Sequence, residues 1–453
     1  MYECGAVDKK VFSGSSPDVQ DAGDGVFSLD PDQKALFDRI ETERGNFFIQ
    51  GQAGTGKSSF IRYLREHSRK RVAVASPTAV AAINVGGVTI HSMFELPLSD
   101  FIILRDVLYE KHFKLPQILA GTDLLVIDEV SMVRPDILDA VDALSRHLRF
   151  GLAPFGGLQV VLVGDLCQLP PVIKPSVSSV YKEKYGSDRA YFFDAHSYAE
   201  GKFEKCEFTR VYRQQDAELL ENLKNLRSGR RLGETLSYFN SAKISDGRIL
   251  DTAVTITPYR SSAERLNRKR LAEIKSEEIC YDCETAGKFD GTADTPAPRK
   301  LILKTGALVI FNRNDSQGKR WINGSSGTVE KLGGDEIEIL LSGGEKVSVK
   351  REVWESHAYG IDPATKEVVE RVTGTFKQFP LQLGYALTIH KAQGKTLDKV
   401  IIDISGGAFA HGQLYVALSR TRKKSDMHIK NRITESDFIT DGRVIDFMGR
   451  DRK

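Results

Sequence analysis

The chain has few cysteines, no long apolar run and almost no net charge. Its five cysteines among 453 residues are scattered, which excludes a disulfide framework and indicates a reducing compartment. No hydrophobic stretch reaches the length of a membrane span, and the N-terminal segment lacks the apolar core of a secretory signal. With 64 Lys and Arg against 61 Asp and Glu, the net charge of +3 does not by itself demand a nucleic-acid partner. Any such surface must come from local clusters of basic residues.

Two local patterns allow more than one interpretation. Basic residues gather at Arg265–Arg270 and at Arg420–Arg432, where a solvated helix face and an interaction surface both remain open. Cys280 and Cys283 form a C-x-x-C pair. Because no second Cys or His pair follows at zinc-ribbon spacing, an ordinary loop is favoured over a metal or redox site.

The most informative stretch is Asn46–Phe60, which predicts an apolar strand, a glycine-rich turn and the start of a helix. It contains the spacing G-x-x-x-x-G-K-S, whose backbone N–H groups and helix dipole hold phosphate oxygens. Lys57 is expected to reach the β- and γ-phosphates, and the Ser58 hydroxyl is expected to ligate Mg²⁺. The nucleotide-binding residues predicted in this loop are Gly51, Ala53, Gly54, Thr55, Gly56, Lys57, Ser58 and Ser59.

Apolar segments in the first half predict the buried strands of one parallel sheet. Beside the strand that leads into the glycine-rich turn, they are 71–76, 123–128 and 158–164. Polar residues follow each strand, and ligands bind at the carboxyl edge of an open α/β sheet. A helix is expected from Pro31, with Asp30 as its N-cap.

The second half predicts another α/β unit interrupted by a β-rich insertion. A strand at 253–258 and a helix at 261–272 restart the pattern, and polar 275–300 is predicted to be a long loop. Short strands parted by glycine turns then predict a small antiparallel barrel. The predicted units are a flexible tail 1–26, a first domain 27–208 with a small insertion 96–118, a second domain 209–300 and 381–453, and the barrel 301–380.

Acidic and amide side chains follow two of these strands. Asp128 is predicted to hold Mg²⁺, and Glu129 to orient or deprotonate water. A surface acidic pair is the alternative, which the upstream loop disfavours. Gln168 follows the next strand, where its amide could contact the γ-phosphate; a plain turn is the alternative there.

The order of motifs resembles that of superfamily 1 helicases of the 5′-to-3′ branch and, among them, the Pif (petite integration frequency) family. The resemblance runs from Gln33 to about Ile429. It rests on GQAGTGKS at 51–58, SPTAVAA at 76–82, GGVTIHSMF at 86–94, VIDEVSM at 126–132, APFGGLQ at 153–159, GDLCQLPPV at 164–172, VYRQQD at 211–216, ALTIHKAQGKTLD at 386–398 and YVALSRTR at 415–422. It implies an α/β fold of two RecA-like P-loop NTPase domains, with a small wedge insertion in the first and an SH3-like β-barrel insertion in the second.

The resemblance also assigns the other residues of the nucleotide site. Gln33 would contact the adenine edge and Tyr212 would stack on the base, with a core tyrosine as the alternative. Arg213 and Arg420 would reach the γ-phosphate across the cleft, because a guanidinium fork matches phosphate oxygens. For each arginine an exposed ion pair is the alternative. Gln393 and Gly394 would complete the wall on the second domain.

Contacts with single-stranded DNA are implied on another face. The residues are Pro77, Thr78, Thr89, His91, Phe94, Thr388, His390 and Lys391. Hydroxyl, imidazole and amine groups suit phosphate contacts that carry no sequence information, although a lone histidine is often a packing residue. Phe94 and Phe101 flank the small insertion, where they either wedge between bases or form its own core.

The function predicted is that of an ATP-dependent 5′-to-3′ DNA helicase, with ATP and Mg²⁺ as cofactors. Its expected partners are single-stranded and tailed duplex DNA, with forked DNA, RNA–DNA hybrids and G-quadruplexes also implied; a monomer with no membrane association is expected. The resemblance implies roles in DNA replication, repair, recombination and telomere maintenance. It places a bacterial protein in the cytoplasm or nucleoid and a eukaryotic one in the nucleus or mitochondrion.

Two other functions remain open. A RecD-like subunit would unwind DNA only within a nuclease complex. A nucleotide-gated DNA-binding protein would change its DNA affinity with ATP and separate no strands.

Overall fold

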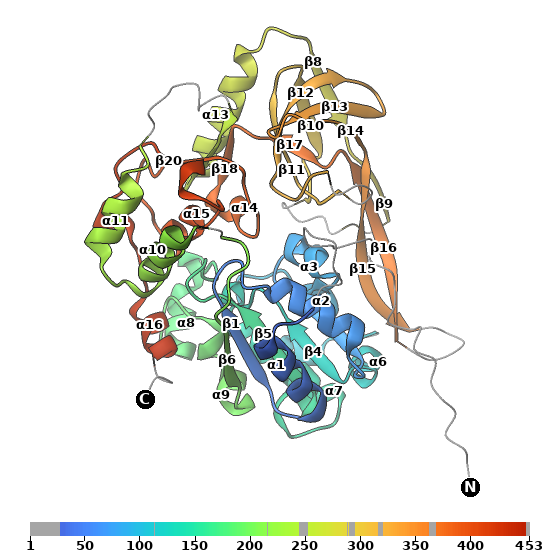
Figure 1. Ribbon diagram of the computed structural model, residues 1–453. Coiled ribbons are helices and arrows are strands. Elements are labelled where there is room, and N and C mark those ends of the chain that lie inside the picture. Colours follow the sequence, from blue (N-terminus) through green and yellow to red (C-terminus); the bar gives the residue numbers. More distant parts are fainter. Residues whose placement is uncertain are drawn as a thin grey trace.

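A computed structural model describes residues 28–449 except 113, 215, 244–251, 288, 290–294, 316–319 and 362–367. The predicted tail 1–26 lies outside these residues. Figure 1 shows two α/β units, one below the other in the view, with a β-rich lobe beside the upper one. No helix among the described residues is long and apolar enough to cross a membrane.

The first unit is built on a six-stranded sheet of order β3-β2-β4-β5-β1-β6, in which every pairing is parallel. Its strands are β1 Phe47–Gly51, β2 Val72–Ser76, β3 Val88–Thr89, β4 Leu124–Ile127, β5 Gln159–Gly164 and β6 Glu204–Phe208. The four strands predicted from the sequence are confirmed. They are continuous apolar runs because helices cover both faces of a parallel sheet.

The helices of this unit precede and follow its strands, and they include the two predicted from the sequence, at Pro31 and after the glycine-rich turn. They are α1 Pro31–Thr42, α2 Lys57–His67, α3 Ala79–Val85, α4 Ile90–Met93, α5 Leu104–Tyr109, α6 Leu115–Ala120, α7 Pro135–Leu148, α8 Ser178–Tyr185 and α9 His196–Gly201. The predicted start of α1 is confirmed. The Asp30 side chain accepts the backbone N–H of Gln33, and the Gln33 side-chain oxygen accepts the backbone N–H of Asp30. This capping box fixes Gln33 beside the phosphate loop.

The second unit has a four-stranded parallel sheet of order β18-β7-β19-β20. Its strands are β7 Val254–Thr257, β18 Ala386–Thr388, β19 Val400–Ile402 and β20 Met427–Ile429, and its helices are α10 Ala217–Ser228, α11 Leu232–Asn240, α13 Arg260–Glu273, α14 Ile389–Ala392 and α15 Gln413–Leu418. The last described helix, α16 Gly442–Gly449, packs against the first unit (Figure 1). There Val444 is buried in the first core, and the Phe447 ring stacks on Phe193 with centroids 4.3 Å apart.

The β-rich lobe contains a five-stranded antiparallel sheet of order β14-β13-β12-β11-β17. Its strands are β11 Leu308–Phe311, β12 Ser326–Leu332, β13 Glu336–Leu341, β14 Lys346–Lys350 and β17 Leu381–Leu383. The prediction of a long loop at 275–300 is wrong, because β8 Glu278–Asp282 and β9 Glu284–Gly287 lie there. Strand β8 pairs with β10 Lys300–Lys304, and the alternate residues Tyr281, Leu301 and Leu303 enter the core of the lobe.

A long hairpin of β15 Glu352–Ile361 and β16 Val368–Gln378 extends from this lobe toward the first unit (Figure 1). The sequence pattern did not predict it. Strand β15 contacts β3, α4 and α6, and Ile83 of α3 packs against the apolar cluster of Trp354 and Phe376. The hairpin therefore lies against the helices that follow β2 and β3. Cys280 of β8 is exposed, and no group of three or more potential metal ligands occurs among the described residues.

Candidate nucleotide site and DNA face

The phosphate loop joins β1 to α2 and is curled around its own lysine. Gly54 and Gly56 adopt φ values of +84° and +79°, a left-handed backbone that favours glycine. A Cβ at Gly54 would also lie 2.4 Å from the Cβ of Arg213. The Lys57 Nζ donates to the carbonyl oxygens of Gly51 and Gln52 at 2.6 and 3.0 Å. The amine is therefore already inside the loop that would hold phosphates.

Three carboxylates follow β4 and β5, the strands on one side of β1. Burial lowers the pKa of Lys57, while the charges of Asp165, Glu129 and Asp128 oppose that shift. Burial raises the pKa of both Asp128 and Glu129. Glu129 has φ +49°, a strained backbone for a residue with a side chain. These acidic groups fit a magnesium ion, which binds proteins through one or two carboxylates and completes its shell with phosphates and water.

Gln168 lies in this part of the cleft, as predicted. Its side chain is buried, and its Nε2 donates to Oδ2 of Asp165 at 3.1 Å. The backbone forms a turn here, with the Gln168 N–H donating to the Asp165 carbonyl at 3.0 Å, so the predicted contact with the γ-phosphate stays a prediction. The NH₂ group of the Gln168 amide is thus held by Asp165, which orients the side chain before any ligand binds.

Arginines from the second unit reach the same cleft. Burial lowers the pKa of Arg213, and burial together with the charge of Arg213 lowers that of Arg420 to about 9. The Nη1 of Arg213 is buried without a hydrogen-bond partner among the described residues. Arg420 donates to backbone carbonyls, including those of Ala392 and Lys395 at 3.3 Å. Neither arginine forms the exposed ion pair considered as an alternative, and their shared positive charge suits a polyanion.

The loop after α14 completes the cleft. The Gln393 Nε2 lies 3.4 Å from Oε2 of Glu129, so the two units touch at the residue predicted to orient water. Gln214 donates to the carbonyl of Ser419 at 3.3 Å, which links the Arg213 segment to α15. Gly394 has φ +77° and continues this wall. The structure thus brings the predicted residues of both halves together.

Gln33 and Tyr212 lie at the open end of the phosphate loop. The Gln33 Nε2 donates to the Thr55 carbonyl at 3.4 Å, and the Tyr212 hydroxyl donates to Asp30 at 2.7 Å. A Cβ at Gly56 would lie 3.1 Å from Gln33 and 3.6 Å from the Tyr212 ring, so both flank this glycine. Tyr212 is 48% exposed, which excludes a core tyrosine. A half-exposed ring beside an amide suits stacking and edge contacts with a base.

Two residues of the cleft were not predicted. The backbone N–H of Ala53 in the phosphate loop donates to the Tyr415 hydroxyl at 3.2 Å, so α15 touches the loop directly. Arg227 of α10 lies 3.4 Å from Asp165. Tyr415 begins one of the recognised segments, which was a usable signal, whereas no local pattern marks Arg227.

Three threonines predicted to contact DNA are helix N-caps. Thr78, Thr89 and Thr388 each accept a backbone N–H at 3.2 Å, at the starts of α3, α4 and α14. Each hydroxyl keeps its own hydrogen to donate. Pro77 precedes the first of these helices, His91 lies in the second, and His390 and Lys391 lie in the third. The predicted DNA residues thus occupy equivalent positions after β2, β3 and β18.

The prediction that Phe94 wedges between bases is not compatible with this structure. Phe94 is fully buried in the first core, where removing its ring from water stabilises the fold. The Phe101 ring packs edge-on against Tyr181 with centroids 5.1 Å apart. Both aromatics therefore serve the core of the first unit and its insertion, which was the alternative interpretation.

Comparisons with known proteins agree with this geometry. A family model described as PIF1-like helicase matches residues 28–228, and one described as UvrD-like helicase C-terminal domain matches residues 383–425. The ATP-dependent DNA helicase Pif1 of Bdellovibrio bacteriovorus is 32% identical over 427 residues, 92% of this chain and 91% of that protein.

Solved structures give the same result. Pif1 from a Bacteroides species in complex with ADP-AlF4 superposes with a TM-score of 0.84 at 34% identity, covering 94% of this chain and 98% of that one. The ssDNA-bound Bacteroides Pif1 gives 0.66 at 35% identity, covering 94% and 97%. The fold and site therefore define a helicase with RecA-like parallel α/β sheets. The chain belongs to the PIF1-like helicase family.

Proposed function

We propose that this chain, an ATP-dependent DNA helicase by family, moves 5′ to 3′ along single-stranded DNA and thereby separates a tailed duplex. The observation that carries the proposal is the two-sided cleft. The phosphate loop, Asp128 and Glu129 lie on the first unit, whereas Arg213 and Arg420 approach from the second. Binding of a triphosphate between two such walls favours their closed arrangement, and its hydrolysis removes that preference.

Each wall has a distinct chemical role in this proposal. The Lys57 amine and the N-terminus of α2 bind the β- and γ-phosphates, and Glu129 accepts a proton from the attacking water. Gln168 orients that water or contacts the γ-phosphate. Arg213 and Arg420 stabilise the charge that develops on the transferred phosphoryl group. Alternating closure moves the two DNA-gripping helix ends relative to one another.

Magnesium is the metal that we assign to this site. Ser58 and Asp128 would hold it, because the neighbouring cation Lys57 does not offset the burial and the Glu129 charge that raise the pKa of Asp128. When bound, the ion neutralises phosphate charge during transfer. The Ser58 hydroxyl stands at the first turn of α2, next to the phosphates that would share the metal.

We assign the five-stranded lobe to the SH3-like module and 96–118 to the wedge. The hairpin β15–β16 lies against α3 and α4, whose N-caps are Thr78 and Thr89. The higher TM-score to unliganded Bacteroides Pif1, 0.84 against 0.66 for its ssDNA complex, supports a change in the arrangement of the chain when DNA binds. Forked DNA, RNA–DNA hybrids and G-quadruplexes remain proposed substrates of a protein that acts as a monomer.

Substitution of the loop lysine tests the assignment. Lys57→Ala should abolish ATP hydrolysis and strand displacement while leaving single-strand binding intact, because the DNA residues lie on other elements. Fluorescence anisotropy with a labelled oligonucleotide provides the binding control. Binding should weaken with salt, with a log–log slope of about −0.7 per phosphate contacted. Retained hydrolysis in Lys57→Ala would contradict the site.

The two other functions are outcomes of the same assays. An isolated chain that hydrolyses ATP but never separates strands fits a subunit of a larger complex. ATP-dependent changes in DNA affinity without strand separation fit a nucleotide-gated binding protein. The full hydrolytic set of Glu129, Gln168 and Arg213 favours the motor.

A further inference from the structure

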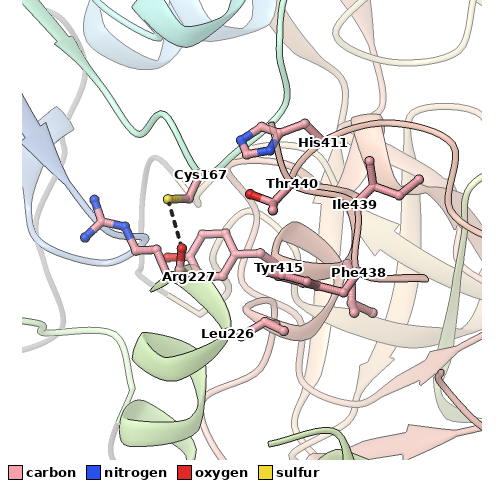
Figure 2. A pocket seen from close by; sticks show the side chains of 10 residues that line it. Cys167, Leu226, Arg227, His411, Tyr415, Phe438, Ile439 and Thr440 are labelled. Carbon is pink, nitrogen blue, oxygen red and sulfur yellow. Dashed lines mark hydrogen bonds between the residues drawn. The ribbon is translucent and has the colours of Figure 1, made fainter. Parts of the chain in front are cut away.

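Residues of the second unit pack against the loop that carries Gln168. Figure 2 shows a narrow hollow at this junction, with Cys167 of the loop facing Arg227, His411 and Tyr415. A Cβ at Gly412 would lie 2.4 Å from the carbonyl oxygens of both Cys167 and Gln168. The loop is therefore packed against the start of α15 with no space for a side chain between them.

His411 adds a directional hydrogen bond to this junction. Its Nδ1 accepts the backbone N–H of Asp441 at 3.0 Å, so the proton is on Nε2, which donates to the Leu166 carbonyl at 2.8 Å. Burial lowers the pKa of His411, which favours this neutral form. A movement of the second unit would therefore be transmitted to the backbone of this loop.

Arg227 makes the corresponding contact with a side chain of the loop. Its Nε lies 3.4 Å from Oδ1 of Asp165, and its Nη1 donates to Glu207 at 3.1 Å. The Asp165 side chain is completely buried and that of Arg227 is 14% exposed. Burial opposes the charge of Arg227, but Asp165 together with Cys167, Tyr415 and Glu207 outweighs burial, and the pKa is raised. This is a desolvated ion pair across the two units, unlike the screened pairs of the surface.

Asp165 links Arg227 to Gln168 through the two oxygens of its carboxylate. Its Oδ1 accepts the N–H of Cys167 at 3.2 Å, and its Oδ2 accepts the amide Nε2 of Gln168 at 3.1 Å. Without Arg227, a buried carboxylate would lose its partner from the second unit and could turn toward Lys57, whose pKa it already affects. The Gln168 amide would then lose the acceptor that sets its orientation.

We propose that Arg227 is a positioning residue for ATP hydrolysis: it holds Asp165, which holds the Gln168 amide toward the γ-phosphate when the two units are in contact. The inference rests on the proposed role of Gln168. Opening of the cleft withdraws Arg227 and releases the amide. Hydrolysis is thereby coupled to domain position through a residue that touches neither the nucleotide nor water.

The test measures DNA-stimulated ATP hydrolysis by the full chain, with kcat and KM determined separately. Arg227→Met should lower kcat on the order of 10–100-fold, as loss of an orienting partner does elsewhere. The KM for ATP should change by less than about 3-fold, because ground-state contacts remain. Lys224→Met on the exposed side of α10 is the matched control and should retain the wild-type kcat.

A double variant separates positioning from a general structural effect. If Arg227 acts through Gln168, Arg227→Met should lower kcat no further in a Gln168→Ala background. Equal losses in both backgrounds would overturn the inference, as would an unchanged kcat in Arg227→Met. If Arg227→Met does not fold, Arg227→Gln decides: its polar side chain removes the positive charge that faces Asp165, so a lowered kcat supports the inference and a wild-type kcat overturns it. A fully active Gln168→Ala would overturn the proposed role of Gln168 and the inference together.

Discussion

The two walls of the nucleotide cleft are built in different ways. On the first wall Lys57 lies among the acidic side chains of Asp128, Glu129 and Asp165, so opposite charges offset one another. On the second wall burial lowers the pKa of both Arg213 and Arg420, and the charge of Arg213 lowers that of Arg420 further. One lysine beside three carboxylates leaves the first wall with excess negative charge that a cation would offset, whereas the second wall carries positive charge that an anion would offset. In the proposed function, a bound triphosphate with its metal ion offsets the charge of both walls and so draws the second toward the first.

The largest effect is expected on the second wall. Arg213→Ala should lower kcat for ATP hydrolysis by about 10³-fold or more, as loss of an arginine finger does in related hydrolases. ATP should also cease to alter the affinity for single-stranded DNA, because closure would lose its anion-binding partner. Steady-state hydrolysis and anisotropy measure the two effects. Arg230→Ala, at an exposed position, should behave as wild type; an Arg213→Ala protein that still closes on ATP would contradict the comparison.

A somewhat smaller loss of ATP hydrolysis is expected for a change on the first wall, without loss of the effect of ATP on DNA affinity. Glu129→Gln should reduce kcat by about 10²–10³-fold, because the proton acceptor is removed. ATP should still modulate DNA affinity, since the arginines remain. Single-turnover hydrolysis and DNA binding in the same buffer would show this. If ATP no longer modulated DNA affinity, Glu129 would belong to closure and not to chemistry alone.

At the base site, a moderate change is expected in KM and little in kcat. Tyr212→Ala should raise the KM for ATP about 10-fold, because stacking on a base contributes roughly 1–3 kcal/mol. Tyr212→Phe keeps the ring and loses only the hydroxyl bond to Asp30, so it should stay near the wild-type KM. Equal changes in both variants would assign the effect to that hydrogen bond.

The smallest effect concerns the pH dependence of stability. Burial lowers the pKa of Lys395 to about 8 from 10.5, and its Nζ donates to Asn323 of the lobe at 2.7 Å. Between about pH 8 and 10.5 the unfolded chain holds a proton that the folded chain has lost, so stability should rise with pH in this window. Lys395→Met should flatten that rise in urea titrations at pH 7.5 and 9.5. Equal slopes for both proteins would contradict it.

Features set by neighbouring residues could be predicted from the sequence, whereas features set by distant partners could not. The loop from Gly51 to Ser58, the strand ends at Asp128 and Glu129, and the cap at Asp30 are local patterns, and the structure places them as expected. The pairing of β8 with β10 and the hairpin β15–β16 depend on partners distant in the chain. Because polar residues alternate along these strands, the sequence of β8 and β9 has the composition of a loop.

Contacts between distant segments were the other source of error. Phe94 was predicted to contact DNA because it flanks the small insertion, but its ring is buried in the core of the first unit. Arg227 has no distinguishing neighbours and becomes notable only beside Asp165. Such roles are set by packing between units, which no local spacing encodes.

Strand displacement on tailed duplexes tests the central claim most directly. The wild-type chain is mixed with duplexes that carry either a 5′ or a 3′ single-stranded tail, with and without ATP, and released strand is measured. We predict ATP-dependent release from the 5′-tailed duplex and none from the 3′-tailed one. Release that favours the 3′ tail, or none from either duplex while ATP is hydrolysed, would contradict a 5′-to-3′ motor driven by closure of these two walls.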